Sequence, residues 1–212
     1  MKNQIIKYFL IALLVIIVDQ IVKVVVYYNM DMGTQGQIMI FGQWFKLHYL
    51  TNPGMAFGMK LNFEYGKLIL TVFRIGAMIA IGYYLYSLIQ KQANSGLIIC
   101  IALILGGAIG NLIDSVFYGI WFDNAPYDAP SPWFHGQVID MFYIDIWEGY
   151  LPNWIPLLGG DYMALWPVFN IADASIFVAI CFIIVFQKRY FKKEEGHSAT
   201  EKESTELSGE NI

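Results

Sequence analysis

The chain has 212 residues, of which 57% are hydrophobic and only 14% are charged, and its formal net charge is −4. This composition is too apolar for a water-soluble domain, whose surface carries a mixture of charges. The negative charge and the lack of a basic stripe argue against a nucleic-acid partner. Length and composition therefore predict one compact integral membrane protein.

Four stretches of the sequence reach the roughly 20 apolar residues that are needed to cross a bilayer. They run from about Ile5 to Tyr28, Leu68 to Ile89, Leu97 to Ser115, and Val168 to Phe186. The first could instead be a cleaved signal peptide, because Lys2 and Lys7 precede it. Its apolar run is long, however, and no small-residue cleavage site ends it. We therefore expect four membrane-spanning helices, with the first one retained.

Basic residues are distributed unevenly between these stretches. They occur before the first stretch, between the second and third, and after the fourth: Lys2, Lys7, Lys91, Lys188, Arg189, Lys192 and Lys193. The connection 116–167 contains acidic residues but no Lys or Arg. The positive-inside rule then places both termini in the cytoplasm and the two long connections outside.

The two outer connections and the C-terminus differ in composition. In the connection 29–67, the run Phe45–Leu50 predicts a strand before a turn at Thr51–Gly54, and a small sheet on the membrane surface is expected. The connection 116–167 is rich in Trp, Tyr and Pro, and is expected to lie on the bilayer, because such rings prefer the headgroup zone. Residues 1–190 would form the membrane domain, and the Lys-, Glu-, Ser- and Thr-rich segment 191–212 a disordered cytoplasmic tail.

Three of the four apolar stretches contain polar residues at a similar depth. The pairs are Asp19 and Lys23, Asn111 and Asp114, and Asn170 and Asp173. Residues three or four apart share one helix face, and at about 1.5 Å per residue all three pairs lie in the outer third of the membrane. Ionisable groups in a membrane are costly, and they are commonly either buried between helices or functional. For Asp19, Lys23 and Asp114 we favour structural support, since Asp19 and Lys23 can pair.

Asp140 lies in the second outer connection, inside the apolar run Val138–Phe142. Its apolar neighbours would draw it down to the membrane surface, where it could meet Asp173. Two carboxylates that share a site cannot both ionise cheaply, so the pair holds one proton, as the pair in aspartic proteases does to activate water. The three histidines show no metal-ligand spacing, so neither a metal nor another cofactor is expected.

Five motifs occur in order along residues 10–187: Asp19–Lys23, Asn52–Gly58, Gly107–Asp114, Val138–Phe142 and Phe169–Asp173. Together they resemble the lipoprotein signal peptidases, the bacterial enzymes that remove the signal peptide from lipid-modified prolipoproteins. The resemblance implies an all-α membrane bundle of four transmembrane helices with a small extracytoplasmic β-cradle. We further expect a monomer in the bacterial inner membrane, with lipid-modified prolipoproteins and membrane lipids as its partners.

The resemblance further implies roles for individual residues. Asp140 and Asp173 would be the catalytic pair of a metal-free aspartic endopeptidase that cleaves before a diacylglyceryl-modified Cys. Substrate contacts are implied at Asn52, Gly54, Asn111 and Asn170. Ser115 stands where the family commonly has an Arg that contacts the substrate backbone, and the segments 118–137 and 147–165 look longer than usual.

Two other classes of function are compatible with a small membrane protein of this kind. A small proton- or ion-coupled transporter could use Asp19, Asp114 and Asp173 as a relay. It would need a continuous polar path, but the cytoplasmic halves of the predicted spans offer almost no ionisable groups. A structural membrane subunit would leave the shared depth of the polar pairs unexplained. The sequence therefore favours the peptidase.

Overall fold

The computed structural model describes residues 2–53, 65–154, 159–160, 162–164 and 166–191. Its main helices are α1 (Lys2–Asn29), α2 (Gly66–Gln90), α3 (Ser95–Ile113) and α5 (Ile171–Val185). Helix α3 continues through a π-helical turn, Asp114–Tyr118, into the short α4 (Gly119–Trp121), and α6 (Gln187–Tyr190) follows α5. A 3-10 turn at Thr34–Gly36 precedes the first strand.

Three helical segments among the described residues are long and apolar enough to cross a membrane: Lys2–Asn29, Gly66–Gln90 and Ser95–Trp121. Helix α5 is equally apolar but has 15 residues, which corresponds to a rise of about 22 Å against the roughly 30 Å of hydrocarbon. The described chain thus has three to four apolar helices of membrane type.

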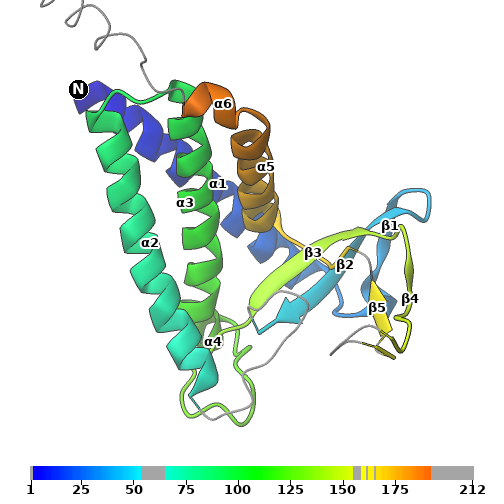
Figure 1. The fold of residues 1–212 in the computed structure, drawn as a ribbon. Helices are drawn as coiled ribbons and strands as arrows, with labels where there is room; N and C mark the ends of the chain where they lie inside the picture. The colour runs from blue at the N-terminus through cyan, green and yellow to red at the C-terminus, as the bar shows by residue number, and fades with distance from the viewer. Residues whose placement is uncertain (1, 54–64, 155–158, 161, 165, 192–212) are drawn as a thin grey trace, which may run out of the picture.

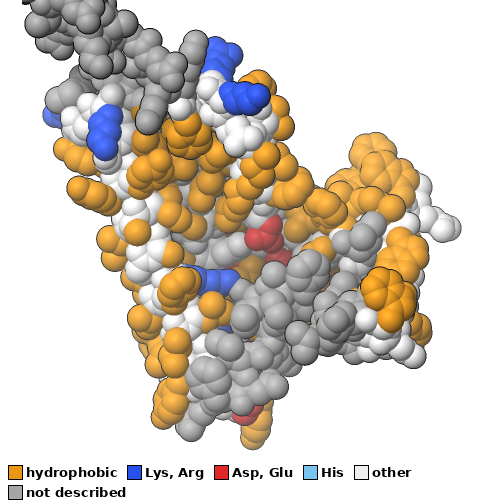
Figure 2. Space-filling view, in the orientation of Figure 1, with side chains coloured by type: hydrophobic (Ala, Val, Ile, Leu, Met, Phe, Trp, Pro, Cys, Tyr) orange, Lys and Arg blue, Asp and Glu red, His pale blue; other side chains and the backbone are white. Residues whose placement is uncertain are grey.

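Side chains on the outside of the helices are those that a lipid environment favours. Large apolar residues are exposed on every main helix, among them Leu14, Phe73, Tyr83, Ile99 and Val185. Figure 2 shows these hydrophobic side chains covering the helices, with a group of basic side chains at the end of the bundle where the N-terminus lies. This distribution fits a bundle embedded in a bilayer.

Helix α3 lies at the centre of the bundle, because its glycines let two other helices approach closely. A Cβ atom built on Gly106 would lie 2.7 Å from the Ala12 carbonyl oxygen of α1. One built on Gly107 would lie 2.5 Å from the Ala172 carbonyl oxygen of α5. The glycine-rich stretch of α3 therefore permits close helix packing on two sides.

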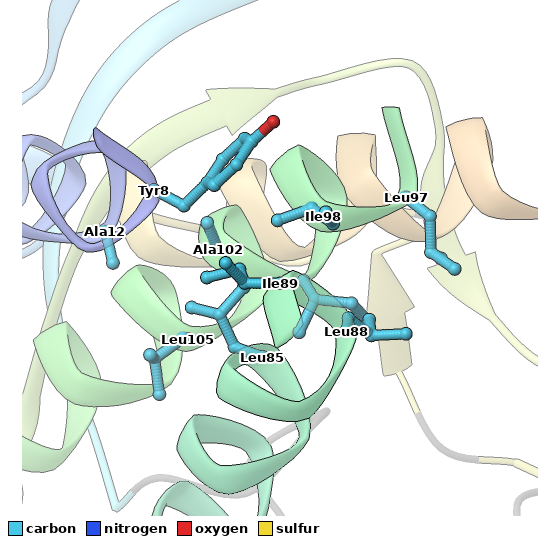
Figure 3. Close-up of a cluster of buried hydrophobic side chains, with 10 residues drawn as sticks. Tyr8, Ala12, Leu85, Leu88, Ile89, Leu97, Ile98, Ala102 and Leu105 are labelled. Atoms are coloured by element: carbon cyan, nitrogen blue, oxygen red, sulfur yellow. The ribbon is translucent and has the colours of Figure 1, made fainter. Parts of the chain in front are cut away.

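Apolar side chains fill the half of the bundle that lies towards the N-terminus. Figure 3 shows them converging from α1, α2 and α3: Tyr8, Ala12, Leu85, Leu88, Ile89, Leu97, Ile98, Ala102 and Leu105. No ionisable side chain belongs to this cluster apart from the Tyr8 phenol. The polar residues of the bundle lie towards its other end, beside the sheet.

A three-stranded antiparallel sheet extends from that other end, here called the sheet end (Figure 1). Its strands, in the order β1-β2-β3, are Ile38–Phe41, Phe45–Asn52 and Val138–Ile144. The strand predicted at Phe45–Leu50 is thus confirmed and extends by two residues. Strands β4 (Glu148–Tyr150) and β5 (Tyr162–Ala164) form a second, two-stranded sheet, which the sequence did not predict.

Candidate active site

Asp140 lies in the middle of β3, where the sheet meets the helices. The strand pairs with β2, so that Leu50 lies opposite Asp140 and Asn52 opposite Val138. The Asp140 side chain is buried and accepts two amide hydrogen bonds. Asn170 Nδ2 donates to its Oδ1 at 2.7 Å, and Asn52 Nδ2 donates to its Oδ2 at 3.0 Å. Both carboxyl oxygens are therefore held in place by neutral amides.

Asp173 lies in the first turn of α5, and the start of that helix fixes its orientation. Asn170 is the N-cap, and its side-chain oxygen accepts from the Asp173 backbone N–H at 2.9 Å. The Asp173 carboxylate accepts in return from the Asn170 backbone N–H at 3.3 Å, which completes a capping box. Its other oxygen accepts from Asn111 Nδ2 of α3 at 2.8 Å.

Two asparagines bridge the two carboxylates. Asn170 Nδ2, which donates to Asp140, also lies 3.1 Å from the Oδ1 of Asn111, whose amide nitrogen donates to Asp173. Lys23 Nζ donates to the same Asn111 oxygen at 2.9 Å, so the amide group of Asn111 has one possible orientation. The predicted meeting of Asp140 and Asp173 is thus found, with the two groups joined through amides.

Burial is the main influence on the ionisation of Asp140. Together with the negative charge of Asp173, it raises the pKa of the Asp140 carboxyl from 3.8 to about 7, although hydrogen bonds from Asn52 and Asn170 act to lower it. A carboxyl group with this pKa holds a proton near neutral pH. The pair can therefore offer one acid and one base at the same time.

A buried ionic network lies directly behind the pair. Lys23 Nζ contacts Asp19 at 2.8 Å and Asp114 at 2.7 Å, and all three side chains are fully buried. Gln20 donates to Asp114 at 2.9 Å and accepts from the Tyr118 hydroxyl at 3.0 Å. The predicted pairing of Asp19 with Lys23 is confirmed, and Asp114 is a further partner of this lysine.

The network also holds the elements that carry the pair. Asp19 Oδ1 accepts from the Ala172 backbone N–H in the first turn of α5, at 2.9 Å. Asp114 Oδ2 lies 3.4 Å from the Ile139 backbone N–H of β3. Asp19 and Asp114 therefore bind the residues that directly precede Asp173 and Asp140, which supports the structural role expected of them.

The remaining candidate residues are placed as follows. Asn52 and Asn170 contact Asp140, and Asn111 contacts Asp173. Gly54 lies outside the described residues. The described part of the chain has no group of three or more His, Cys, Asp or Glu side chains that could hold a metal ion.

Arg74 of α2 is a polar residue beside the site that the sequence motifs do not include. Its Nη1 donates to Ser115 Oγ at 3.1 Å, at the start of the π-helical turn. The sequence does contain an indication of its importance, because an arginine inside a predicted apolar span is usually functional.

Two linked carboxyl groups, set where a helical membrane bundle meets a small sheet, are typical of the class of membrane aspartic peptidases. Comparison with known families agrees with this, because residues 11–188 match the family of signal peptidase (SPase) II. The chain belongs to this signal peptidase II family.

Individual relatives and solved structures support the assignment. The chain is 47% identical to the lipoprotein signal peptidase of Amoebophilus asiaticus, over 98% of this chain and 89% of that protein. It is 39% identical to the lipoprotein signal peptidase of Porphyromonas gingivalis, over 83% of this chain and 80% of the relative. A bacterial membrane enzyme solved by the in meso method at 2.3 Å superimposes with a TM-score of 0.58 at 25% identity, over 90% of this chain and 93% of that one. The transporter alternative is therefore not favoured.

Proposed function

We propose that this peptidase removes the signal peptide from diacylglyceryl-modified prolipoproteins, cleaving before the lipidated Cys, with Asp140 and Asp173 as its catalytic pair. One observation carries the proposal: two carboxylates from different elements are linked through Asn111 and Asn170, and the pKa of Asp140 is raised to about 7. Family membership supports the reaction class, and the names of the relatives support the substrate.

The reaction would use the two carboxyl groups in opposite protonation states. Asp140 holds the proton, and the ionised Asp173 removes a proton from a water molecule as that water attacks the scissile carbonyl. Asp140 donates its proton to the carbonyl oxygen in the same step, which gives a tetrahedral intermediate. As the C–N bond breaks, Asp173 passes the proton taken from water to the leaving amine, and Asp140 recovers a proton from the intermediate's hydroxyl group. This scheme requires neither a nucleophilic side chain nor a metal ion.

The amides around the pair would both orient the carboxyl groups and bind the peptide. Asn52 ends strand β2 and reaches Asp140, so a peptide that lies beside this end of the strand would pass close to the pair. Asn111 and Asn170 hold the carboxylates on the other side. Gly54, which lies outside the described residues, is the fourth proposed substrate contact.

The membrane arrangement that we propose has four crossings, with both termini in the cytoplasm of a bacterial inner membrane. Helix α5 has 15 residues, but α6 follows it after a single turn residue, Phe186, and the helical segment 171–190 has a length typical of a span. Lys188 and Arg189 lie in this last turn. Figure 1 places α6 at the same end of the bundle as the N-terminus, as two cytoplasmic ends would be.

The sheets would lie at the outer membrane surface. Every residue of β1 is exposed, including Ile38, Met39 and Phe41, and so are Trp147, Tyr150 and Trp154 around β4. Such apolar and aromatic surfaces are typical of the headgroup zone. We propose that residues 1–190 form one monomeric membrane domain; of the predicted tail 191–212, residues 192–212 lie outside the described residues.

The direct test is a cleavage assay with the purified protein in detergent. A synthetic precursor with a signal peptide and a diacylglyceryl-modified Cys is incubated with the enzyme, and the products are analysed by mass spectrometry. We expect one cut, immediately before the modified Cys. An uncut precursor, or a cut elsewhere in the signal peptide, would reject the proposed reaction.

A further inference from the structure

Helix α2 presents a polar face to the candidate active site. Lys67, Thr71 and Arg74 are four and three residues apart, so they share one face of the helix. Lys67 Nζ donates to the Pro53 carbonyl oxygen, just after strand β2. Thr71 Oγ1 contacts the Phe134 carbonyl oxygen at 3.0 Å, in the connection that leads to β3. This face therefore adjoins both chain segments that lead into the site.

Arg74 is the residue of this face that lies deepest in the bundle. It follows Gly66, the first residue of α2, by eight positions, which corresponds to about 12 Å along the helix. Ser115, its hydrogen-bond partner, lies six positions before the end of the helical segment Ser95–Trp121, or about 9 Å from the same end of the bundle. An arginine at this depth is costly, and it is usually retained for a functional reason.

The contacts of Arg74 connect it to the catalytic pair. Ser115 Oγ, which accepts from Arg74, donates to the Asn111 carbonyl oxygen at 3.1 Å. The Asn111 side chain in turn donates to Asp173. The guanidinium is thereby oriented by the same turn of α3 that orients one of the two carboxylates.

Charge also favours a cation at this position. The site contains four buried or largely buried carboxyl groups, those of Asp19, Asp114, Asp140 and Asp173. Lys23 pairs with Asp19 and Asp114. Arg74 lies within electrostatic range of Asp173 and Asp114, so it adds positive charge on the side of the site that faces α2. Figure 2 shows a group of acidic side chains and a group of basic side chains near each other in the middle of this face.

We propose that Arg74 is a substrate-binding residue whose guanidinium donates hydrogen bonds to a main-chain carbonyl of the signal peptide beside the scissile bond, with Ser115 fixing its orientation. A peptide unwound for cleavage within the membrane has carbonyl groups that lipid chains cannot satisfy, so a protein donor beside them stabilises the bound peptide. A guanidinium is suited to this because it carries five N–H donors and stays charged.

This assignment rests on the proposed function, and it accounts for one departure from the resemblance. The family commonly has an Arg at the position of Ser115. In this chain the guanidinium reaches that position from α2, and the serine is its hydrogen-bond partner.

The test measures steady-state kinetics of Arg74→Gln and Arg74→Lys on the lipidated precursor. We expect Arg74→Gln to raise KM at least tenfold, with a smaller fall in kcat, and Arg74→Lys to give an intermediate KM because it keeps the charge but loses the fork of donors. Lys91→Gln, which removes an exposed cation at the other end of α2, is the matched control and should leave KM unchanged.

A binding experiment separates substrate contact from helix packing. In the inactive Asp140→Asn background, the further change Arg74→Gln should weaken binding of the lipidated precursor at least tenfold, at an unchanged melting temperature. A lowered melting temperature with normal KM and normal binding would mean that Arg74 only fastens α2 to α3, and would overturn the inference. Activity in Asp140→Asn itself would instead refute the proposed function.

Discussion

Replacing Asp140 by Asn should remove activity and, at the same time, stabilise the folded protein. The Asp140 carboxyl is 2% exposed, and its pKa is raised from 3.8 to about 7, chiefly by burial and then by the charge of Asp173. A raised carboxyl pKa means that the folded state binds the proton more tightly than the unfolded state. The stability that depends on this proton is complete below pH 3.8 and is lost as the pH rises through about 7.

The size of the effect follows from the shift. One pKa unit corresponds to about 1.4 kcal/mol, so relative to a neutral side chain the Asp140 carboxyl lowers stability by about 4 kcal/mol at pH 8 and by about 1.5 kcal/mol at pH 5, where only the unfolded state is ionised. Asn has nearly the same shape but no charge, so the Asp140→Asn variant avoids this cost. Its advantage over the wild type should therefore grow by roughly 2–3 kcal/mol between pH 5 and pH 8.

Thermal unfolding in detergent at the two pH values measures this difference. For a chain of this length the change corresponds to an additional increase of about 5–10 °C in the melting temperature at pH 8. Asp145→Asn is the matched control, because Asp145 is partly exposed and pairs with Lys46 at 2.8 Å. The melting temperature of Asp145→Asn relative to the wild type should not increase further at pH 8. The reasoning would be refuted if Asp140→Asn had the same melting temperature as the wild type at both pH values, or if its increase in melting temperature were larger at pH 5 than at pH 8.

Four further predictions concern the site and the membrane arrangement. The turnover number should fall as the pH rises through about 7, because Asp140 must hold a proton to act as the acid; a rate that keeps rising to pH 9 would contradict this role. Lys23→Met should lower stability by about 3–5 kcal/mol, because it leaves Asp19 and Asp114 buried without their cation, whereas Lys91→Met should have little effect on the melting temperature. Cysteines introduced at Ser131 and Ser198 should react with impermeant reagents from opposite sides of the membrane, and labelling from one side would exclude four crossings. An unlipidated precursor should be cut at least about a hundredfold more slowly, corresponding to roughly 2.7 kcal/mol, because the two acyl chains fix the depth of the scissile bond; equal rates would show that the enzyme reads the peptide alone.

The long helices could be predicted from the sequence because a membrane span depends mainly on the length of an apolar run. The fourth helix shows where this reasoning ends. The apolar run predicts a span from Val168, but Phe169 pairs with Phe142 of β3, and the helix begins at Ile171, after the Asn170 cap. The sequence shows that Asn170 and Asp173 are three residues apart, but only the backbone geometry shows that they form a capping box.

The site was predictable to the extent that its residues carry an unusual chemistry for their position. Asp140 and Asp173 could be paired because both are carboxylates near one depth, and Asp19 and Lys23 because they are one helical turn apart. The second partner of Lys23, Asp114, comes from another helix, and no spacing reveals it. In the sequence, the neighbours of Arg74 are mostly apolar, so the pattern predicts only a membrane span there. The hydrogen bond from Arg74 to Ser115 is seen only in the structure.

The central claim is that Asp140 and Asp173 together perform the hydrolysis, and turnover by single Asn variants tests it most directly. Asp140→Asn and Asp173→Asn should each lose nearly all cleavage of the lipidated precursor while remaining folded, and Asp145→Asn should keep it. Addition of EDTA to the wild type should change nothing. Full turnover by either of the first two variants, or loss of wild-type activity with the chelator, would contradict the account.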